Sequence, residues 1–368
     1  MMNLNNVKKF LKHESVFTIS AILALTSMIA VSPCHEYLGY INYSVISMLF
    51  CLMVTVQGFS QAGVFRYISG KLISRFGSSR ALSAILMLIC FFMSMLITND
   101  VALLTFIPLT MIIFKDSGKV LMRCCILETA AANLGSMLTP VGNPQNLFLY
   151  THYNYSMLDF LCTMLPLTLI SLVLLIISVA FIPSEKIEVS DNEYNFKYTS
   201  KTFMYTVILI VCLCTVCRVL DYRICLAFTI AVSLIFDRHI LKKPDYVLLA
   251  TFVCFFIFIG NVSSIESVRN IISSAISGRE LLISCAFSQV ISNVPCAVMI
   301  SGFTDKANEI LKGVNIGGLG TIIASLASLI SYKFYAASKN ADKKKYLTEF
   351  TVYNFAMLFL LMIFAWVI

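Results

Sequence analysis

Two groups of polar residues interrupt the apolar sequence of this chain. One comprises Thr98-Asn99-Asp100 and the segment 133–150, and the other comprises Ser292-Asn293 and the segment 315–332. Amide and hydroxyl oxygens can coordinate a cation such as Na⁺, while amide nitrogens and hydroxyl groups can donate hydrogen bonds to a carboxylate or an oxyanion. The candidate binding residues are Thr98, Asn99, Asp100, Thr139, Gly142, Asn143, Asn146, Ser292, Asn293, Thr321, Ser325 and Ser328.

Asp100 and Glu128 are two acidic residues that fall within long apolar stretches. Carboxylates in such surroundings are costly and often carry ions or protons, so both are candidate coupling residues. Asp100 is preferred because it stands in a polar turn. Glu128 follows Arg123 by five residues and has a second interpretation, an ion pair near a membrane surface. No Arg or Lys occurs at either interruption, which argues against a multiply charged ligand.

The cysteine and histidine residues do not indicate a metal centre. The only metal ion expected is a possible Na⁺, bound by oxygen atoms. Cys212, Cys214 and Cys217 have ligand-like spacing, but they lie in an apolar run without histidine and are interpreted as buried thiols. The sequence also lacks HExxH, GxSxG and paired catalytic aspartates. We therefore expect neither an enzyme nor a resident cofactor.

The elements that position these residues are transmembrane helices. Of the 368 residues, 59% are hydrophobic and 12% are charged, and the apolar residues form long runs without period-2 alternation. Such runs predict an all-α polytopic membrane protein surrounded by lipid. The net charge of +8 comes from basic residues between the runs, a pattern that records membrane orientation, so no nucleic-acid partner is expected. The predicted spans cover 16–32, 45–64, 157–182, 203–219, 224–236, 246–262 and 348–368.

The two interruptions resemble one another in sequence. With one constant offset, Asn133 aligns with Asn315, Asn143 with Ser325 and Tyr150 with Tyr332 in the segments that follow the two polar turns, which indicates an internal duplication. Each copy is expected to contain a broken helix, at 124–150 and 313–335, with the first break at 140–146. Each copy also has paired apolar arms, at 81–114 and 281–303, too short for two full spans, so both are predicted to be re-entrant hairpins.

The distribution of basic residues predicts the orientation of the chain. With the N-terminus in the cytoplasm and the C-terminus outside, 21 of the 27 Lys and Arg residues lie on the cytoplasmic side. The two copies then have opposite orientations, which is an inverted-topology repeat. The first repeat is expected at 1–182, a connecting loop and extra span at 183–222, and the second repeat at 223–368. The first hairpin enters from the cytoplasm and the second from outside.

These residues resemble the ion transporter superfamily, which includes divalent anion/sodium symporters, citrate transporters, arsenite permeases and NhaD-type antiporters. The resemblance covers nearly the whole chain, and its most specific part is Thr139-Pro140-Val141-Gly142-Asn143-Pro144-Gln145-Asn146. The hairpin tips are similar to the Ser-Asn-Thr tips of dicarboxylate carriers, although neither tip retains the full motif. The resemblance implies a solute held between tips and broken helices, sodium sites beside the tips, elevator-like alternating access and commonly a homodimer.

The sequence thus predicts a secondary transporter of the cell membrane that moves a small anion, coupled to Na⁺ or H⁺. The alternatives are a Na⁺/H⁺ antiporter with Asp100 as the proton carrier and an arsenite-type efflux permease. An anion is preferred as the solute because uncharged amide and hydroxyl side chains occur at matching positions in the two breaks.

Overall fold

The protein is all-helical across the residues that the computed structural model describes, apart from one isolated bridge between Ser78 and Lys186. These residues are 14–33, 35–65, 67, 77–186, 199–338 and 341–367. The predicted helical class is confirmed. The basic residues at 8, 9, 12, 66, 71 and 75, on which part of the charge count depends, lie outside the described residues.

Nine of the labelled helices precede residue 220, and two of them are short. They are α2 (Ser15–Ala30), α3 (Tyr37–Tyr40), α4 (Tyr43–Gln61), α6 (Ser79–Ile97), α7 (Asn99–Ile113), α8 (Gly118–Ser136), α9 (Pro144–His152), α10 (Met157–Val179) and α11 (Ser200–Val216). The remainder are α12 (Tyr222–Phe236), η1 (Ile240–Lys242), α13 (Tyr246–Ser264), α14 (Glu266–Ile276), α15 (Glu280–Ile291), α16 (Asn293–Ser301), α17 (Ala307–Gly317), α18 (Leu326–Ala336) and α19 (Lys343–Val367).

Five helices among the described residues are long and apolar enough to cross a membrane, namely α4, α6, α10, α13 and α19. A sixth span results if α14 and α15, which are bent by 105° at their junction, are counted together. The structure is therefore that of a multi-pass membrane protein.

Three of the predicted spans form helices that are apolar but short for a full membrane crossing. The helices α2, α11 and α12 contain 16, 17 and 15 residues. At 1.5 Å per residue they measure about 22–26 Å, less than a hydrocarbon core of about 30 Å. Polar capping residues set the ends of α12, because the Asp221 side chain accepts a hydrogen bond from Arg223 N and Asp237 follows the last turn.

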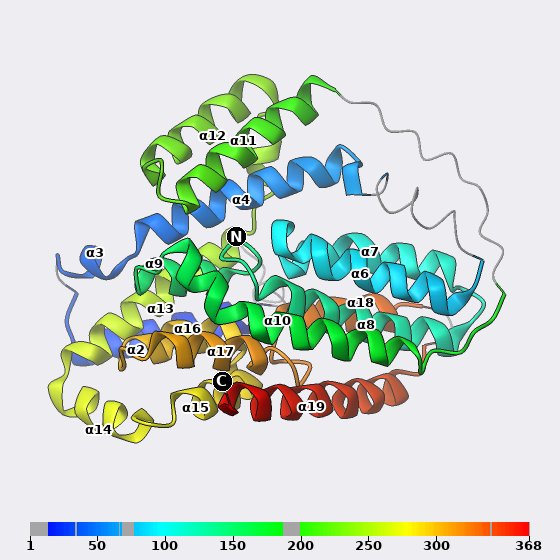
Figure 1. Ribbon diagram of the computed structural model, residues 1–368. Coiled ribbons are helices and arrows are strands. Elements are labelled where there is room, and N and C mark those ends of the chain that lie inside the picture. The colour runs from blue at the N-terminus through cyan, green and yellow to red at the C-terminus, as the bar shows by residue number, and fades with distance from the viewer. Residues whose placement is uncertain are drawn as a thin grey trace, which may run out of the picture.

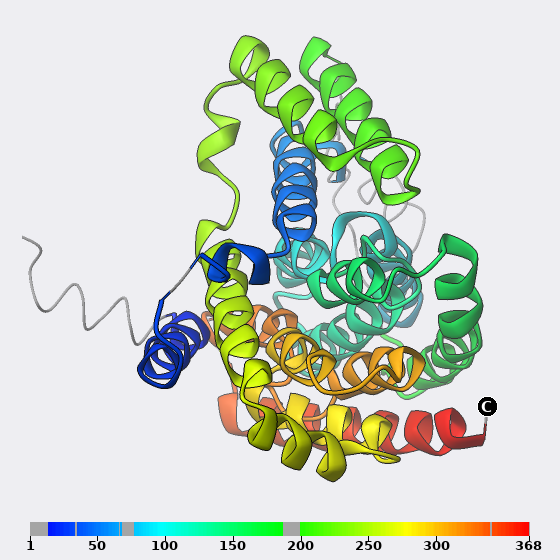
Figure 2. The same cartoon turned by 90° about the vertical axis from the view of Figure 1, so that its left-hand side faces the viewer.

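Helices from distant parts of the sequence pack together. Figure 1 shows α6 and α7 side by side, and both pack on α8, while α15, α16 and α17 form a second group. Each of the short helices α9 and α18 packs against the group from the other part of the chain. Helix α9 packs on α16 and α17, and α18 packs on α7 and α8. In Figures 1 and 2, α11 and α12 lie beside α4 at one edge, and α19 lies at the opposite edge.

Glycine residues allow close approaches between helices in both groups. A Cβ atom at Gly135 of α8 would lie 2.0 Å from the carbonyl oxygen of Phe91 in α6. In the second group, a Cβ atom at Gly317 of α17 would lie 2.8 Å from Ser288 Cβ in α15. Small residues that let helix backbones approach are typical of membrane helix interfaces.

Several predicted boundaries need correction. The first broken helix begins at Gly118 instead of 124, and its break covers 137–143, earlier than the expected 140–146. The second begins at Ala307 instead of 313 and breaks at 318–325. Cys212 is buried as expected, but Cys214 is half-buried and Cys217 is exposed.

Candidate functional site

The two polar turns share an unusual backbone conformation. Thr98, between α6 and α7, has φ 70° and ψ 146°, and Ser292, between α15 and α16, has φ 76° and ψ 153°. This region is nearly restricted to glycine and costs a larger residue on the order of 1–3 kcal/mol. Both turns join two helices without any intervening loop, so each strained residue alone reverses the chain.

Each turn is hydrogen-bonded to the neighbouring helix break. The backbone N–H of Asn99 donates to the carbonyl of Gly142 at 3.0 Å, and that of Asn293 donates to the carbonyl of Ala324 at 2.9 Å. Gly142 and Ala324 occupy aligned positions in the two halves. The glycine is required because a Cβ atom there would lie 2.1 Å from the carbonyl oxygen of Ser136.

Two threonines make a second matching pair of contacts. Thr139 Oγ1 donates to the carbonyl of Met95 in α6. Thr321 Oγ1 donates to the carbonyl of Gln289 in α15 at 2.9 Å, and the Gln289 side chain accepts from Thr321 N. Each threonine therefore anchors its break to the last turn of the helix before a polar turn, which is α6 for Thr139 and α15 for Thr321.

Asn133, in the last turn of α8, connects the first polar turn to the second break. Its Oδ1 accepts from Asn99 Nδ2 at 2.9 Å and from Ser325 Oγ at 3.0 Å. Its Nδ2 approaches Ser328 Oγ at 3.4 Å and the Gly318 carbonyl at 3.5 Å. All four side chains are buried, at 4% exposure or less. The first tip and the second break thus meet at one side chain.

Asn315, in the last turn of α17, makes the reciprocal connection. Its Nδ2 donates to Asn146 Oδ1 at 2.7 Å, and its Oδ1 accepts from Asn143 Nδ2 at 3.4 Å. Asn143 also caps α9 by accepting from Asn146 N, and Pro144 occupies the first helical position, which tolerates proline. Asn133 therefore bonds from the first half of the chain to the second break, and Asn315 bonds from the second half to the first break. We call this group of buried polar side chains the centre.

The second tip lies beside this centre but shares no side-chain hydrogen bond with the first. Ser292 Oγ lies 3.4 Å from the Ala324 carbonyl. Asn293 approaches Gly318 so closely that a Cβ atom there would lie 2.9 Å from Asn293 Nδ2. The structure thus gathers both tips and both breaks around the crossing asparagines.

Asp100 lies on a cavity next to this centre. The cavity has a volume of about 170 Å³, and its wall includes Thr98, Asp100 and Asn143 together with Lys243 and Asp245 from the loop before α13. The sequence places no cation at the breaks, but the fold brings Lys243 into this wall from a distant loop. The cavity can therefore present both charges to a small ion.

Glu128 lies apart from the centre and does not pair with Arg123. It is fully buried in α8, where Oε1 accepts from Thr110 Oγ1 in α7 at 2.5 Å, and Oε2 has no hydrogen-bond partner among the described residues. Arg123 instead contacts Glu349 at 3.4 Å and the carbonyl of Phe181. The ion pair considered for Glu128 is wrong because α10 and α19 supply the partners of Arg123.

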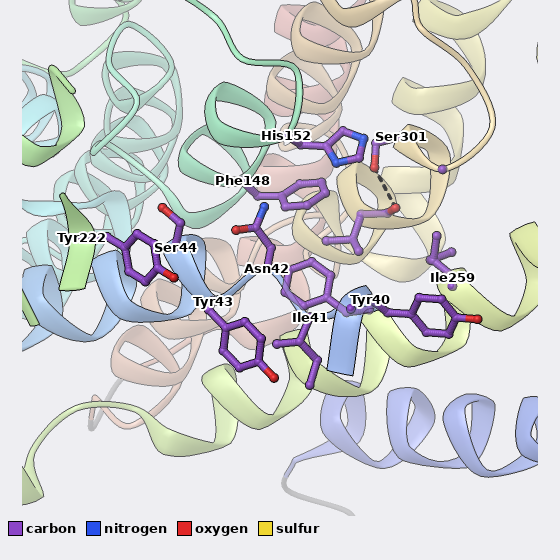
Figure 3. A pocket seen from close by; sticks show the side chains of 15 residues that line it. Tyr40, Ile41, Asn42, Tyr43, Ser44, Phe148, His152, Tyr222, Ile259 and Ser301 are labelled. Atoms are coloured by element: carbon purple, nitrogen blue, oxygen red, sulfur yellow. Dashed lines mark hydrogen bonds between the residues drawn. The ribbon is translucent and has the colours of Figure 1, made fainter. Parts of the chain in front are cut away.

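A larger pocket of about 540 Å³ lies elsewhere, around the starts of α4 and α12 and the end of α9. Figure 3 shows the side chains around it, among them Asn42, Phe148, His152 and Tyr222. Its lining includes none of the predicted binding residues. The smaller cavity beside Asp100 is therefore the candidate binding cavity, despite its size.

Sequence reasoning aligned Asn133 with Asn315 but did not include them among the binding residues. It also missed Gln289, whose amide donates to the carbonyls of Gly317 and Leu319 at 2.8 and 3.0 Å. The alignment of two asparagines at the ends of helices was the available signal. Their partners lie in the other half of the chain, and the sequence alone does not reveal them.

The fold is that of a multi-pass membrane protein that encloses a buried polar centre. The chain belongs to the CitMHS citrate transporter family, whose model matches residues 13–313. This is a family of transporters and not of enzymes, and its members carry small solutes.

Individual relatives agree with this assignment. The chain is 34% identical over 304 residues to the uncharacterized transporter MJ0456 of Methanocaldococcus jannaschii, covering 81% of this chain and 82% of that protein. It is 26% identical over 322 residues to the inner membrane protein YbiR of Escherichia coli, covering 86% and 85% of the two chains. A shorter stretch is 27% identical over 151 residues to the silicon efflux transporter LSI3 of Oryza sativa, covering 40% of this chain and 31% of that protein.

Proposed function

We propose that this protein is a secondary active transporter that moves a small anion, a carboxylate or an oxyanion, by alternating access coupled to Na⁺ or H⁺. The observation that carries the proposal is the reciprocal crossing of Asn133 and Asn315. Each asparagine lies in the helix before its own break and bonds to the break of the other half, so movement of one half changes hydrogen bonds of the other. Polar breaks at the centre of a helical membrane protein are typical of transporter binding sites.

The proposal includes an inverted-topology repeat, with repeats at 1–182 and 223–368 joined by 183–222. Three kinds of contact recur at aligned positions: tip N–H to break carbonyl, threonine to the last turn of a hairpin helix, and asparagine to the opposite break. Such recurrence is what a duplicated unit produces. The opposite orientation rests on the basic residues, with the N-terminus cytoplasmic and the C-terminus outside.

The binding residues in this proposal are the predicted set at the two tips and the two breaks. Asn143 and Ser325 are the N-cap residues of α9 and α18, and the N-terminal N–H groups of these helices favour anionic oxygens. Asn99 and Asn293 add amides. Na⁺ can be coordinated by the carbonyl and hydroxyl oxygens of the same segments, and no other metal or cofactor is part of the proposal.

Asp100 is the proposed coupling residue because it lies on the cavity wall with no ion pair among the described residues. Glu128 is a second candidate, fully buried and bonded through only one carboxylate oxygen. Replacing Asp100 by Asn should abolish gradient-driven accumulation while leaving counterflow exchange of solute. Retained accumulation in Asp100→Asn, with loss in Glu128→Gln, would transfer the role to Glu128.

A Na⁺/H⁺ antiporter is the second candidate function, favoured by the convergence of Asp100 and Asp245 on one small cavity. An arsenite-type efflux permease uses the same architecture without coupling to Na⁺. One transport assay distinguishes the antiporter from the permease. The antiporter moves protons on addition of Na⁺ without any solute, while the permease transports uncharged arsenous acid and is indifferent to Na⁺.

The direct test is uptake by the purified protein in liposomes. Radiolabelled citrate, succinate and sulfate, and separately arsenous acid as the solute of the permease, are presented with inward gradients of Na⁺, of H⁺ or of neither. The proposal expects accumulation of at least one anion that depends on one gradient. Absence of transport for every anion, together with Na⁺-driven proton movement, would replace it by the antiporter. A homodimer in the membrane is expected, and cross-linking of the reconstituted protein tests it.

A further inference from the structure

Lys312, in the middle of α17, is a buried lysine without a partner. It is 8% exposed, and it is the only buried Lys or Arg among the residues that the structure describes. Within that part of the chain, its ammonium group makes no ion pair and no hydrogen bond. Buried lysines are nearly always paired, because the desolvation of an unpaired charge is costly. Lys312 is therefore suited to hold an anion that is not part of the chain.

Lys312 lines a pocket of about 610 Å³ between the first turns of α10 and α17. Asn308 lines the same pocket, four residues before Lys312 on α17. Its Oδ1 accepts from Tyr155 at 2.6 Å and from Thr163 Oγ1 at 3.5 Å, while its Nδ2 has no acceptor among the described residues. The pocket therefore offers an ammonium group and an amide N–H on one face of α17.

Asp159 is the acidic residue of this pocket, and it does not neutralise Lys312. Its Oδ2 accepts from Ser156 Oγ at 2.6 Å, and its backbone N–H donates to the same hydroxyl group at 3.0 Å. These contacts hold Asp159 in the first turn of α10, where it is exposed to solvent. Because water screens an exposed charge more strongly than a buried one, the pocket near Lys312 favours an anion.

Helix α17 connects this pocket to the centre. Asn308, Lys312 and Asn315 follow one another at intervals of four and three residues, which places them on one face of the helix. The rise along the helix axis from Lys312 to Asn315 is about 4.5 Å. Asn315 in turn bonds to Asn143 and Asn146 of the first break. An anion at Lys312 therefore lies within about one helical turn of an asparagine of the centre.

The aligned face of α8 carries no such cation. With the offset that aligns Asn133 with Asn315, Ala130 takes the place of Lys312, and Ala130 is fully buried. The pocket thus belongs to one half of the chain and to the face on which α10 and α17 begin. In the proposed orientation this is the outer face of the membrane.

We propose that Lys312 and Asn308 form a second anion-binding site, which holds the solute on the outer face before it reaches the centre. The inference rests on the proposed transport function and adds to it a site of entry. Lys312 Nζ and Asn308 Nδ2 donate to the oxygens of a carboxylate or an oxyanion. The phosphate of an anionic lipid head group has the same chemistry, and the test separates the two sources.

Cys162 is an exposed thiol on the wall of this pocket and provides a reporter in the wild-type protein. The protein is placed in nanodiscs of zwitterionic lipid, and the alkylation rates with anionic iodoacetate and neutral iodoacetamide are read at each cysteine by peptide mass spectrometry. The rate ratio of iodoacetate to iodoacetamide at Cys162 should be at least about twofold lower in Lys312→Gln than in wild-type protein. The ratio at Cys217, which is exposed outside this pocket, should not change.

Two further variants control for charge and for folding. Lys312→Arg keeps the cation and should keep the wild-type ratio at Cys162. Lys306→Gln removes an exposed cation just before α17 and outside the pocket, and it should also leave the ratio unchanged. Lys312→Gln removes an unpaired buried charge, so it should melt at or above the temperature of wild-type protein. If Lys312→Gln keeps the wild-type ratio, or if Cys162 reacts with neither reagent, the inference is wrong.

Competition identifies the source of the anion. At fixed ionic strength, citrate, succinate or sulfate should slow the reaction of iodoacetate with Cys162 in wild-type protein but not in Lys312→Gln. Nanodiscs that contain anionic lipid are compared with those of zwitterionic lipid alone. If anionic lipid protects Cys162 and the dissolved anions do not, the site binds a lipid head group and the inference is wrong.

Transport from each face tests whether the site serves entry. In vesicles of known orientation, Lys312→Gln should raise KM about tenfold for solute presented at the outer face, with little change in the maximal rate, because it removes a charged contact made before translocation. KM for solute presented at the inner face should stay at the wild-type value. An equal rise of KM from both faces would refute a site of entry.

Failure of this inference can be told from failure of the proposed function, because alkylation of Cys162 requires no transport. If wild-type protein transports an anion and Lys312→Gln changes neither the alkylation ratio nor KM, transport stands and the site at Lys312 is refuted. If wild-type protein transports none of the anions and none of them protects Cys162, both proposals fail.

Discussion

Thr98 and Ser292 hold the same strained backbone conformation at the two polar turns, with φ angles of 70° and 76°. Each stands immediately before an asparagine whose N–H reaches a helix break. The strain persists because the contacts of the following residue fix it in place. Strained residues that are over-determined by their surroundings cluster at functional sites, and these two lie where the solute is proposed to bind.

Relief of this strain should separate stability from transport. In Thr98→Gly and Ser292→Gly, strain of about 1–3 kcal/mol is released and about 0.5–1 kcal/mol is lost to backbone entropy, so each variant should be as stable as wild-type protein or more so. Transport should slow because the tip is no longer held in one conformation. The control Thr105→Gly, inside α7, has no strain to release and should be destabilised by about 0.3–0.5 kcal/mol through lost helix propensity. Chemical denaturation and initial uptake rates measure both effects, and a tip variant as unstable as the control would argue against stored strain.

Gly142 should tolerate no side chain. An added methyl group would stand 2.1 Å from the Ser136 carbonyl oxygen, which belongs to the backbone and has little room to move. Gly142→Ala should therefore cost about 1–3 kcal/mol or more and disturb the carbonyl that accepts from Asn99. Gly39→Ala is the control, because nothing lies within 4 Å of the added atom. Melting temperatures of the two purified variants check the prediction, and an unaltered Gly142→Ala would show that the break is looser than described.

Asp237, which follows α12, should make stability depend on pH. Burial alone would raise its pKa, but hydrogen bonds from Lys201 Nζ at 2.9 Å and Tyr205 at 3.0 Å outweigh burial, and the pKa lies below its ordinary value. A lowered folded-state pKa stabilises the protein above the ordinary aspartate pKa of about 3.9, and this contribution is lost as the pH falls through the lower folded value.

The variant Asp237→Asn should therefore be less stable than wild-type protein at pH 7, by no more than about 1 kcal/mol for a pair near the surface. The difference should shrink as the pH falls below 4. Paired denaturation curves at pH 7 and pH 3 measure it. A difference that stays constant with pH would assign the effect to lost packing instead of charge.

The sequence was informative where the local pattern was strong. Thr98 and Ser292 could be placed at turns between helices because each interrupts an apolar run and is followed by an asparagine. The motif from Thr139 to Asn146 marked the first break, although the helix before it ends earlier, at Ser136. Proline at 140 and 144 gives the impression of a later break, while the last turn of α8 already ends before the first of them.

Other features depend on tertiary contacts or on weaker patterns. The helix α14, Glu266–Ile276, was not predicted because it is amphipathic and lacks a continuous apolar run. Lys243 reaches the Asp100 cavity through the loop before α13, and the partners of Asn133 come from the other half of the chain. The spacing of residues along the sequence does not reveal these contacts between distant segments.

The most direct test of the shared site is solute uptake by the double variant Asn99→Ala/Asn293→Ala in liposomes. These residues supply the amides of the two tips, and the account requires both amides at one solute site. Asn354→Ala, a buried asparagine of α19 outside the centre, is the control. With thermal unfolding confirming that all proteins are folded, we expect at least about a hundredfold loss of uptake in the double variant, as for two hydrogen bonds to a charged group, and little change in the control. Uptake at the wild-type rate in the double variant would contradict the account.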